Sequence, residues 1–315
     1  MAFNSVRALE QMMLIRAYEE KLVELQASGG APGTCTSVGQ EASGVGVVSA
    51  LRSDDLILTN HRSASHLIAR GADLGRLFAE VMGKKDGYCA GKSGSLHISV
   101  EELGVLLTST IVGGELGLAT GVGLSRSMGD GDAIVVCFFG DGAACEGRFH
   151  ESINLAAVWG LPILYVCENN QWQAFVHRRE TMLTDRIADH APAYGIKGET
   201  VDGNEVEAVY EAAARAVASV RSTRKPFLLE TNTYRLRGHF EPDDQSYVDP
   251  TELDRWRRRD PIALLKAKLT TNGLLAPSAL NAIEQSIRMQ VVDGVRFAQA
   301  SPYPDFAELT TDVYA

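Results

Sequence analysis

Two short polar motifs directly follow buried-type apolar runs, and their residue types suit a divalent cation beside an anion. The first is Gly140-Asp141-Gly142, at the end of the apolar run 133–140. Its glycines permit a tight turn and close approach of backbone N–H groups to an anion, and Asp141 supplies a hard oxygen ligand. The second is Asn169-Asn170, at the end of the run 161–170. Carboxylate, amide and carbonyl oxygens suit octahedral Mg²⁺, with diphosphate oxygens completing its shell.

The spacing of the two motifs strengthens this interpretation. Between Gly142 and Asn169 lie 26 residues, enough for one crossover helix and its return strand. Adjacent parallel strands would then bring Asp141 and Asn170 together. The plainer alternative is that both motifs are only tight turns, which the pair at this interval disfavours. A dinucleotide-binding site is a poor competitor, because no G-x-G-x-x-G opens a helix here.

The elements that must position these residues alternate between strands and helices. Apolar and amphipathic patterns predict strands at 56–58, 133–140, 161–170 and 226–235, and helices at 6–27, 73–82, 113–128, 146–159 and 204–222. The ranges 87–98 and 236–250 are polar or glycine-rich and are predicted as loops. A glycine-rich segment with Gly33, Gly39, Gly44 and Gly46 follows the first helix, and the chain after residue 250 is predicted to be mainly helical. This order predicts an α/β fold with a doubly wound, mostly parallel sheet. Ligands bind such sheets at the carboxyl ends of the strands.

Composition narrows the function classes. The 315 residues are 45% hydrophobic and 22% charged, which is ordinary for a soluble globular protein. A net charge of −10 disfavours nucleic acid and anionic membranes as partners, since both attract positive fields. No apolar run approaches the roughly 20 residues of a membrane span. The first residues lack the pattern of a signal or transit peptide, so we predict a cytoplasmic protein.

The string GDGAACEGRFHESINLAAVWGLPILYVCENN (140–170) resembles the thiamine diphosphate motif of the E1 α subunits of pyruvate, acetoin and branched-chain 2-oxo acid dehydrogenases. Further pieces resemble the same subunits in the same order: VGQEA (38–42), NHRSASH (60–66), GKSGSLHI (91–98), STIVGGELGLATG (109–121), YRLRGHFEPDDQSY (234–247) and the ending SPYPDFAELTTDVYA (301–315). The resemblance implies one thiamine diphosphate-binding domain over 1–315, with an N-terminal helical extension and a helical C-terminal region.

The resemblance also implies roles for individual residues. Asp141, Asn170 and the backbone carbonyl of Trp172 are the implied Mg²⁺ ligands. The implied contacts of thiamine diphosphate are His61, Arg62, Ile111, Val112, Gly140, Asp141, Gly142, Ala143, Asn170 and His239. The candidate catalytic histidines are His239 and His66. Two plainer readings remain: Val112 as an ordinary core residue and His239 as a solvated loop histidine.

Part of the implied active site lies outside this chain. Thiamine diphosphate enzymes need a glutamate beside the aminopyrimidine ring, and in this family a separate β subunit carries it. The chain is too short for the second α/β domain that would otherwise supply it. The resemblance therefore implies an α2β2 heterotetramer, an oxidoreductase that cleaves a 2-oxo acid such as pyruvate, or acetoin. The acyl unit would pass to a lipoyl-bearing E2 acyltransferase.

Four departures from the family pattern keep alternatives open. Ala64 replaces a histidine, Cys35 stands where a histidine commonly precedes G-Q-E-A, Arg237 replaces the first histidine of H-G-H, and Trp172-Gln173 replaces Tyr-Gly or Tyr-Ala. The GHFEPDD loop is closest to that of acetoin dehydrogenases. One alternative uses the same cofactor to move a two-carbon unit from a ketose to an acyl-carrier protein. Another is a non-catalytic binding subunit.

Overall fold

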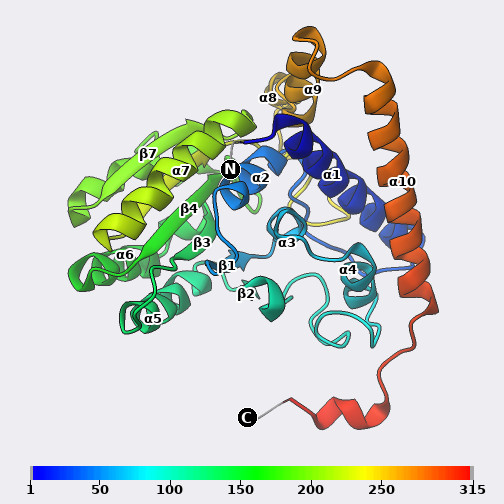
Figure 1. Cartoon of the computed structure of the whole chain (residues 1–315), viewed down its shortest axis with the longest axis horizontal. Helices are drawn as coiled ribbons and strands as arrows, with labels where there is room; N and C mark the ends of the chain where they lie inside the picture. Colours follow the sequence, from blue (N-terminus) through cyan, green and yellow to red (C-terminus); the bar gives the residue numbers. More distant parts are fainter. Residues whose placement is uncertain (1–2, 313–315) are drawn as a thin grey trace.

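A six-stranded sheet forms the centre of the molecule (Figure 1), and every pair of neighbouring strands in it is parallel. The computed structural model describes residues 3–312. The first two residues of the predicted domain, and residues 313–315 of its quoted ending, lie outside the described residues. The strand order is β2-β1-β3-β4-β8-β7. Their bounds are β1 Leu56–Asn60, β2 Val105–Ser109, β3 Val135–Gly140, β4 Ile163–Asn169, β7 Lys197–Asp202 and β8 Phe227–Asn232.

Helices cover both faces of this sheet, as the predicted doubly wound fold requires. Strand β3 shows the division, because Val136 and Phe138 join one core cluster while Val135, Cys137 and Phe139 join the other. On the Cys137 face lie α5 (Gly114–Ser127) and α6 (Gly147–Trp159). On the Phe138 face lie α2 (Glu41–Ser49), α3 (Ala64–Arg70) and α7 (Val206–Thr223). The predicted α/β fold class is confirmed.

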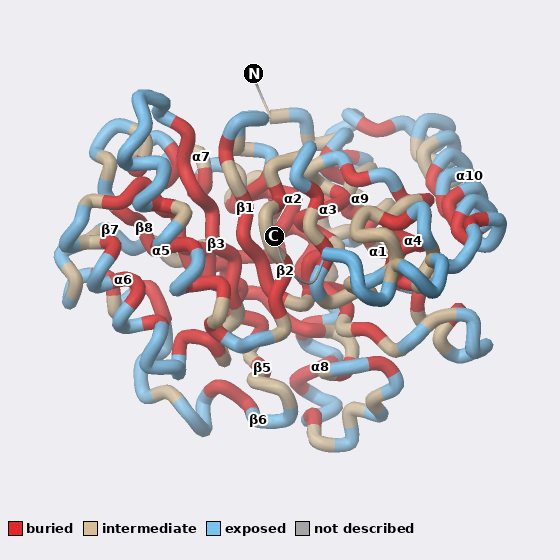
Figure 2. The backbone as a smooth tube through the Cα atoms, turned by 90° about the horizontal axis from the view of Figure 1, so that it is seen from below, coloured by how far each residue is buried: buried red, intermediate tan, exposed pale blue. Residues whose placement is uncertain are grey.

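Further helices extend the Phe138 side into a second layer (Figure 1). The long helices α1 and α10 lie there with α4 and α9, and the tube view shows the buried strands at the centre of the molecule (Figure 2). The bounds of these four helices are α1 Ser5–Ala27, α4 Leu74–Val81, α9 Pro261–Thr271 and α10 Pro277–Ala300. A further helix, α8, spans Pro250–Arg257. Within residues 3–312, no helix combines the length and apolar character needed to cross a membrane.

The sequence patterns did not predict strand β7 or helix α2, because neither segment has a clear hydrophobic pattern. Strand β7 is a polar edge strand with no fully buried residue, so it carries no apolar run. Helix α2 is rich in glycine and was predicted only as a glycine-rich segment. Its glycines are explained by packing: a Cβ at Gly44 would lie 2.7 Å from Ser65 Oγ, and one at Gly46 would lie 2.6 Å from Val209 Cγ1. Close contacts with α3 and α7 therefore require small residues there.

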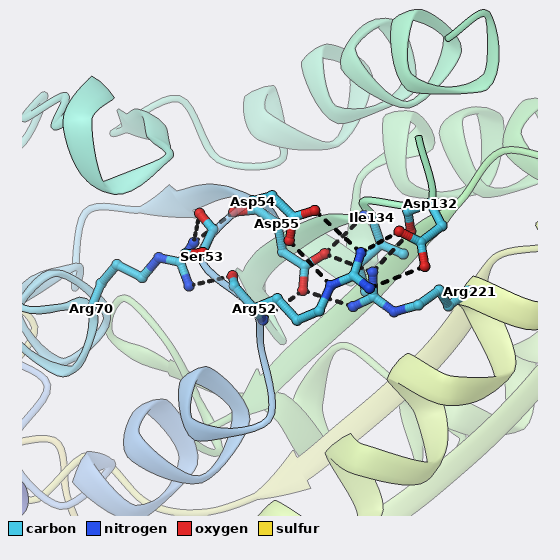
Figure 3. Close-up of polar contacts among 8 residues, drawn as sticks. All are labelled: Arg52, Ser53, Asp54, Asp55, Arg70, Asp132, Ile134 and Arg221. Carbon is cyan, nitrogen blue, oxygen red and sulfur yellow. Dashed lines mark hydrogen bonds and ion pairs between the residues drawn. The ribbon is translucent and has the colours of Figure 1, made fainter. Parts of the chain in front are cut away.

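A buried carboxylate, drawn with its contacts in Figure 3, ties together the chain at the amino ends of strands β1 and β3. Asp55, which precedes β1, is fully buried and accepts hydrogen bonds from the backbone N–H of Arg52 (2.8 Å) and of Ile134 (3.0 Å). The guanidinium of Arg221 donates to both its oxygens, at 3.1 and 2.9 Å. Arg70 binds three carbonyls of the loop 52–55. This cluster joins β1, β3 and α7.

Candidate functional site

A cavity of about 350 Å³ opens at the carboxyl ends of β1, β3 and β4. This volume lies within the usual range for small-molecule sites. The residues that the sequence assigned to cofactor and metal all line it: His61, Arg62, Ile111, Val112, Gly140, Asp141, Gly142, Ala143, Asn170, Trp172 and His239. The register of the strands explains why Asp141 and Asn170 lie at the same end of the sheet. Gly140 of β3 pairs with Glu168 of β4, so Asp141 and Asn170 follow neighbouring strand ends.

Asp141 is the most unusual polar group in this cavity. It is 1% exposed, and neither of its carboxylate oxygens has a hydrogen-bond partner among the described residues. Burial raises the pKa of Asp141 to about 6, and nearby N–H groups and the cations Arg178 and Arg235 oppose the shift only in part. A buried carboxylate without partners is costly unless a cation or donors meet it. Its chemistry therefore fits a bound cation.

Asn170 is held in one orientation beside Asp141. Its Nδ2 donates to Gln40 Oε1 at 3.1 Å, and its Oδ1 accepts from the backbone N–H of Trp172 at 3.1 Å. The amide oxygen keeps a second lone pair for a ligand. Across residues 3–312, no three His, Cys, Asp or Glu side chains form a metal-binding group. The predicted magnesium set is of another type, because Asp141 is its only acidic member.

A guanidinium and two imidazoles, those of Arg62, His61 and His239, also line the cavity. Arg62 Nη1 donates to Thr36 O at 2.6 Å, and Nη2 donates to His239 O at 2.9 Å and lies 3.2 Å from its Nδ1. The rings of His61 and His239 meet edge to face, with centroids 6.0 Å apart. Burial, with the Arg62 charge beside it, lowers the pKa of His61 to about 3 and that of His239 to about 4. At neutral pH each ring is uncharged and carries one N–H donor.

His66, the other predicted catalytic histidine, does not line the cavity. It is fully buried, and its ring stacks on Phe138 at 3.8 Å. Its Nδ1 lies 2.7 Å from Thr59 Oγ1 and its Nε2 lies 3.2 Å from Glu168 Oε1. Glu168 does line the cavity and also accepts from Ser43 Oγ at 2.9 Å. Glu168 therefore connects His66 to the cavity.

Several lining residues were given no role in the sequence. Gln40 belongs to the quoted VGQEA string, and its Nε2 has no partner among the described residues. Glu115, in the first turn of α5, is buried, and its Oε2 has no partner in the described part of the chain; burial raises the pKa of Glu115 to about 8. The other cavity residues missed are Asn60, Ser109, Gly113, Cys145, Glu146, Glu168, Gln173 and Ala174. Most of these residues lie within the family-like strings quoted above, so their position in those strings could have identified them as candidates.

Arg235 is a second buried arginine near the cavity that the sequence did not single out. It is 1% exposed, and it donates to Ala174 O at 2.9 Å and to the Tyr247 hydroxyl at 2.8 Å, while Nη1 has no partner among the described residues. Burial and the neighbouring charge of Arg62 lower the pKa of Arg235 to about 10. It stays protonated at neutral pH and adds positive charge near Arg62 and Asp141.

The four departures from the family pattern have different surroundings. Trp172 lines the cavity, and its indole N–H donates to the Tyr234 hydroxyl at 2.9 Å. Cys35 and Ala64 line a separate small cavity behind His61. Arg237 forms an ion pair with Glu241 at 2.5 Å and is not part of the main cavity wall. Of the four departures, only the Trp172-Gln173 pair therefore lines the main cavity directly.

A doubly wound α/β sheet with a cavity at the carboxyl ends of its strands is the arrangement in which open α/β proteins bind small ligands. Comparison with known proteins gives the family. Residues 10–307 match the model of the dehydrogenase E1 component. The chain belongs to this family and is an E1 α-type subunit of the 2-oxo acid and acetoin dehydrogenases.

The relatives are similar over nearly the whole chain. The α subunit of acetoin:2,6-dichlorophenolindophenol oxidoreductase from Bacillus subtilis is 41% identical over 307 residues, covering 97% of this chain and 92% of the relative. The pyruvate dehydrogenase E1 α subunit of Rhizobium meliloti is 36% identical and covers 98% and 90%. The chloroplastic pyruvate dehydrogenase E1 α-3 subunit of Arabidopsis thaliana is 34% identical and covers 97% and 73%.

Proposed function

We propose that this chain binds thiamine diphosphate through Mg²⁺, as the α subunit of an E1 enzyme that cleaves a 2-oxo acid such as pyruvate, or acetoin. The acyl unit then passes to the lipoyl group of an E2 component. One observation carries the proposal. Within residues 3–312, neither oxygen of the buried Asp141 carboxylate has a hydrogen-bond partner, and the cavity around it is lined by every residue that the sequence assigned to this cofactor. Residues 1–315 form its single cofactor-binding domain.

Some residues of the cavity suit binding of a cation, and others suit binding of an anion. Asp141, Asn170 and the carbonyl of Trp172 would hold Mg²⁺. Arg62 would offer the diphosphate a positive charge, and His61 and His239 would each offer it a neutral N–H donor. Thiamine diphosphate supplies the electron sink for cleaving the carbon–carbon bond beside a carbonyl. Asp141 and Asn170 are only 1% and 5% exposed, and such burial strengthens their electrostatic contacts with a ligand.

We also propose that a β subunit completes the active site and supplies the catalytic glutamate, in an α2β2 assembly. The relatives are named as α subunits, which implies a second kind of subunit. Ile111 and Val112, which line the cavity, are 62% and 51% exposed. Apolar side chains on the neighbouring helices α5 and α6 are also exposed, among them Leu118, Val158 and Trp159. Such exposed apolar surface fits a subunit contact.

Titration calorimetry on the complex of this chain with its β subunit tests the cofactor. We expect thiamine diphosphate to bind in the presence of Mg²⁺ and to bind far more weakly after chelation. Absence of binding under both conditions would contradict the proposal. It would instead support the alternative of a non-catalytic binding subunit.

A second candidate function concerns the donor and the acceptor. Trp172 and Gln173, which depart from the family pattern, both line the cavity, and Gln173 Nε2 lies 3.3 Å from Cys145 Sγ. Because this part of the cavity wall differs from the family pattern, the second candidate is transfer of a two-carbon unit from a ketose to an acyl-carrier protein. The α/β complex should be assayed with pyruvate, acetoin and ketose phosphates, with a lipoyl domain or a carrier protein as acceptor. Lipoyl-dependent turnover of pyruvate or acetoin would exclude this second candidate.

A further inference from the structure

A buried carboxyl group on α1 is connected to the cavity wall through two consecutive residues. Glu19 is 1% exposed, and its Oε1 accepts from the backbone N–H of Ser37 at 2.7 Å and from its hydroxyl at 2.9 Å. The preceding residue, Thr36, offers its carbonyl to Arg62 Nη1. Arg62 in turn binds His239. A continuous path of short contacts therefore joins α1 to the loop histidine.

A small cavity of about 20 Å³ lies behind His61 and adds a second connection. Glu19, Thr36 and His61 all line it, and His61 also lines the main cavity. Glu19 Oε2 and Thr36 Oγ1 are buried and have no partner among the described residues. A water molecule needs about 10–15 Å³ of such space and two or more polar partners. The small cavity has the size and the polar groups for one water between Glu19 and His61.

The charges around Glu19 favour its neutral form. Burial raises the pKa of Glu19 to about 8; the hydrogen bonds from Ser37 and the charge of Arg16 lower it, whereas Glu41 raises it. Glu80 and Arg62 are the other charged groups near this part of α1. As a neutral acid, Glu19 accepts hydrogen bonds at Oε1 and donates one from Oε2.

We propose that Glu19 is a positioning residue for Arg62 and His61, acting on the first through Ser37 and Thr36 and on the second through one water in the small cavity. The proposal rests on the proposed function, in which both residues face the cofactor diphosphate. His61 lines both cavities. A hydrogen bond from the water to one ring nitrogen of His61 would place the ring proton on the other nitrogen, which would then be the donor available to the diphosphate.

Three variants of the α/β complex test this role. Glu19→Gln keeps an acceptor and a donor in place but cannot ionise. Glu19→Leu removes both, and Glu20→Gln, at the exposed next position, is the matched control. Affinity for thiamine diphosphate with Mg²⁺ is measured by calorimetry between pH 6.5 and 9, with thermal unfolding as the check on folding.

The expected results differ for each variant. Wild-type affinity falls as the pH rises through about 8, where Glu19 loses its proton. Glu19→Gln keeps the neutral-pH affinity and loses this alkaline fall, whereas Glu19→Leu weakens binding at least about tenfold at every pH. Should Glu19→Leu not fold, the pH profile of Glu19→Gln still decides.

An alkaline fall in Glu19→Gln equal to that of the wild type would overturn the role of Glu19, as would wild-type affinity in Glu19→Leu. Absence of Mg²⁺-dependent binding in the wild type would overturn the proposed function and this role together. The two failures are therefore distinguishable.

Discussion

Arg62 and His239 are 177 positions apart in the sequence, and Arg62 Nη2 donates to the carbonyl of His239 at 2.9 Å. The same nitrogen lies 3.2 Å from His239 Nδ1. The arginine therefore fixes the loop that carries the histidine, and both residues line the main cavity. Since Nη1 is bound to Thr36 O, the planar guanidinium holds two separate chain segments in one orientation.

Replacing this guanidinium by an ammonium should be costly, because a lysine cannot span both partners with fixed geometry. We expect Arg62→Lys to lower affinity for thiamine diphosphate by about 10–100-fold, the range found for groups that orient ligands. The loop 236–247 should also become more sensitive to limited proteolysis. Lys substitution at the exposed Arg179 is the control. Unchanged affinity and unchanged loop cleavage in Arg62→Lys would contradict the role of this contact.

Asp141→Asn should weaken ligand binding while it raises the stability of the metal-free protein. Without its charge, residue 141 loses the hard anionic ligand, and we expect Mg²⁺-dependent cofactor affinity to fall at least about 100-fold. The metal-free variant should nevertheless be more stable than the wild type at pH 7. The reason is that burial raises the pKa of Asp141 to about 6, so wild-type stability declines as the pH rises from about 4 through 6.

Thermal unfolding of both proteins in chelator, at pH 4.5 and pH 7.5, checks the stability part. The stability advantage of Asp141→Asn should be larger at pH 7.5. An equal advantage at both pH values would show that Asp141 has other partners in solution.

The sequence predicted most of the cavity because its residues lie in short motifs at strand ends. Gly140, Asp141 and Asn170 follow from strand pattern and spacing alone, since parallel neighbours end on the same edge. Their assignment to magnesium and thiamine diphosphate came from the family resemblance and stays a prediction. The register of β3 with β4 is as that reasoning requires.

The residues that the sequence did not identify depend on packing between distant segments. Glu19 lies on α1, and nothing in the helical pattern indicates that it reaches Ser37. Arg235 stands within a quoted motif, but its burial between two other segments has no local signal. His66 shares a string with His61, yet α3 begins at Ala64 and turns the His66 ring onto Phe138, away from the cavity. A seven-residue string therefore serves both the cavity wall and the core.

Asp55 provides a test of stability far from the site. Its carboxylate is fully buried, and Arg221 and two backbone N–H groups bind it. Removing one member of a buried ion pair leaves the other charge uncompensated and costs about 3–5 kcal/mol. We expect Asp55→Ala to lose about this much in denaturant unfolding, while Ala at the exposed Asp54 changes stability by about 0.5 kcal/mol or less. Cofactor affinity measured below the unfolding transition should be unchanged in both.

His61 gives a prediction for stability at acidic pH, and the expected change of stability with pH has the opposite sign to that for Asp141. Burial lowers the pKa of His61 from 6.5 to about 3, so the unfolded chain binds a proton there at pH values where the folded chain does not. The stability that this shift contributes is present above pH 6.5 and is lost as the pH falls toward 3. His61→Gln cannot take up the proton, so its thermal midpoint should fall less steeply than that of the wild type between pH 6.5 and 4.5. His97→Gln, at an exposed position, is the matched control. Parallel curves for wild type and His61→Gln would mean that His61 is solvated rather than held in the cavity wall.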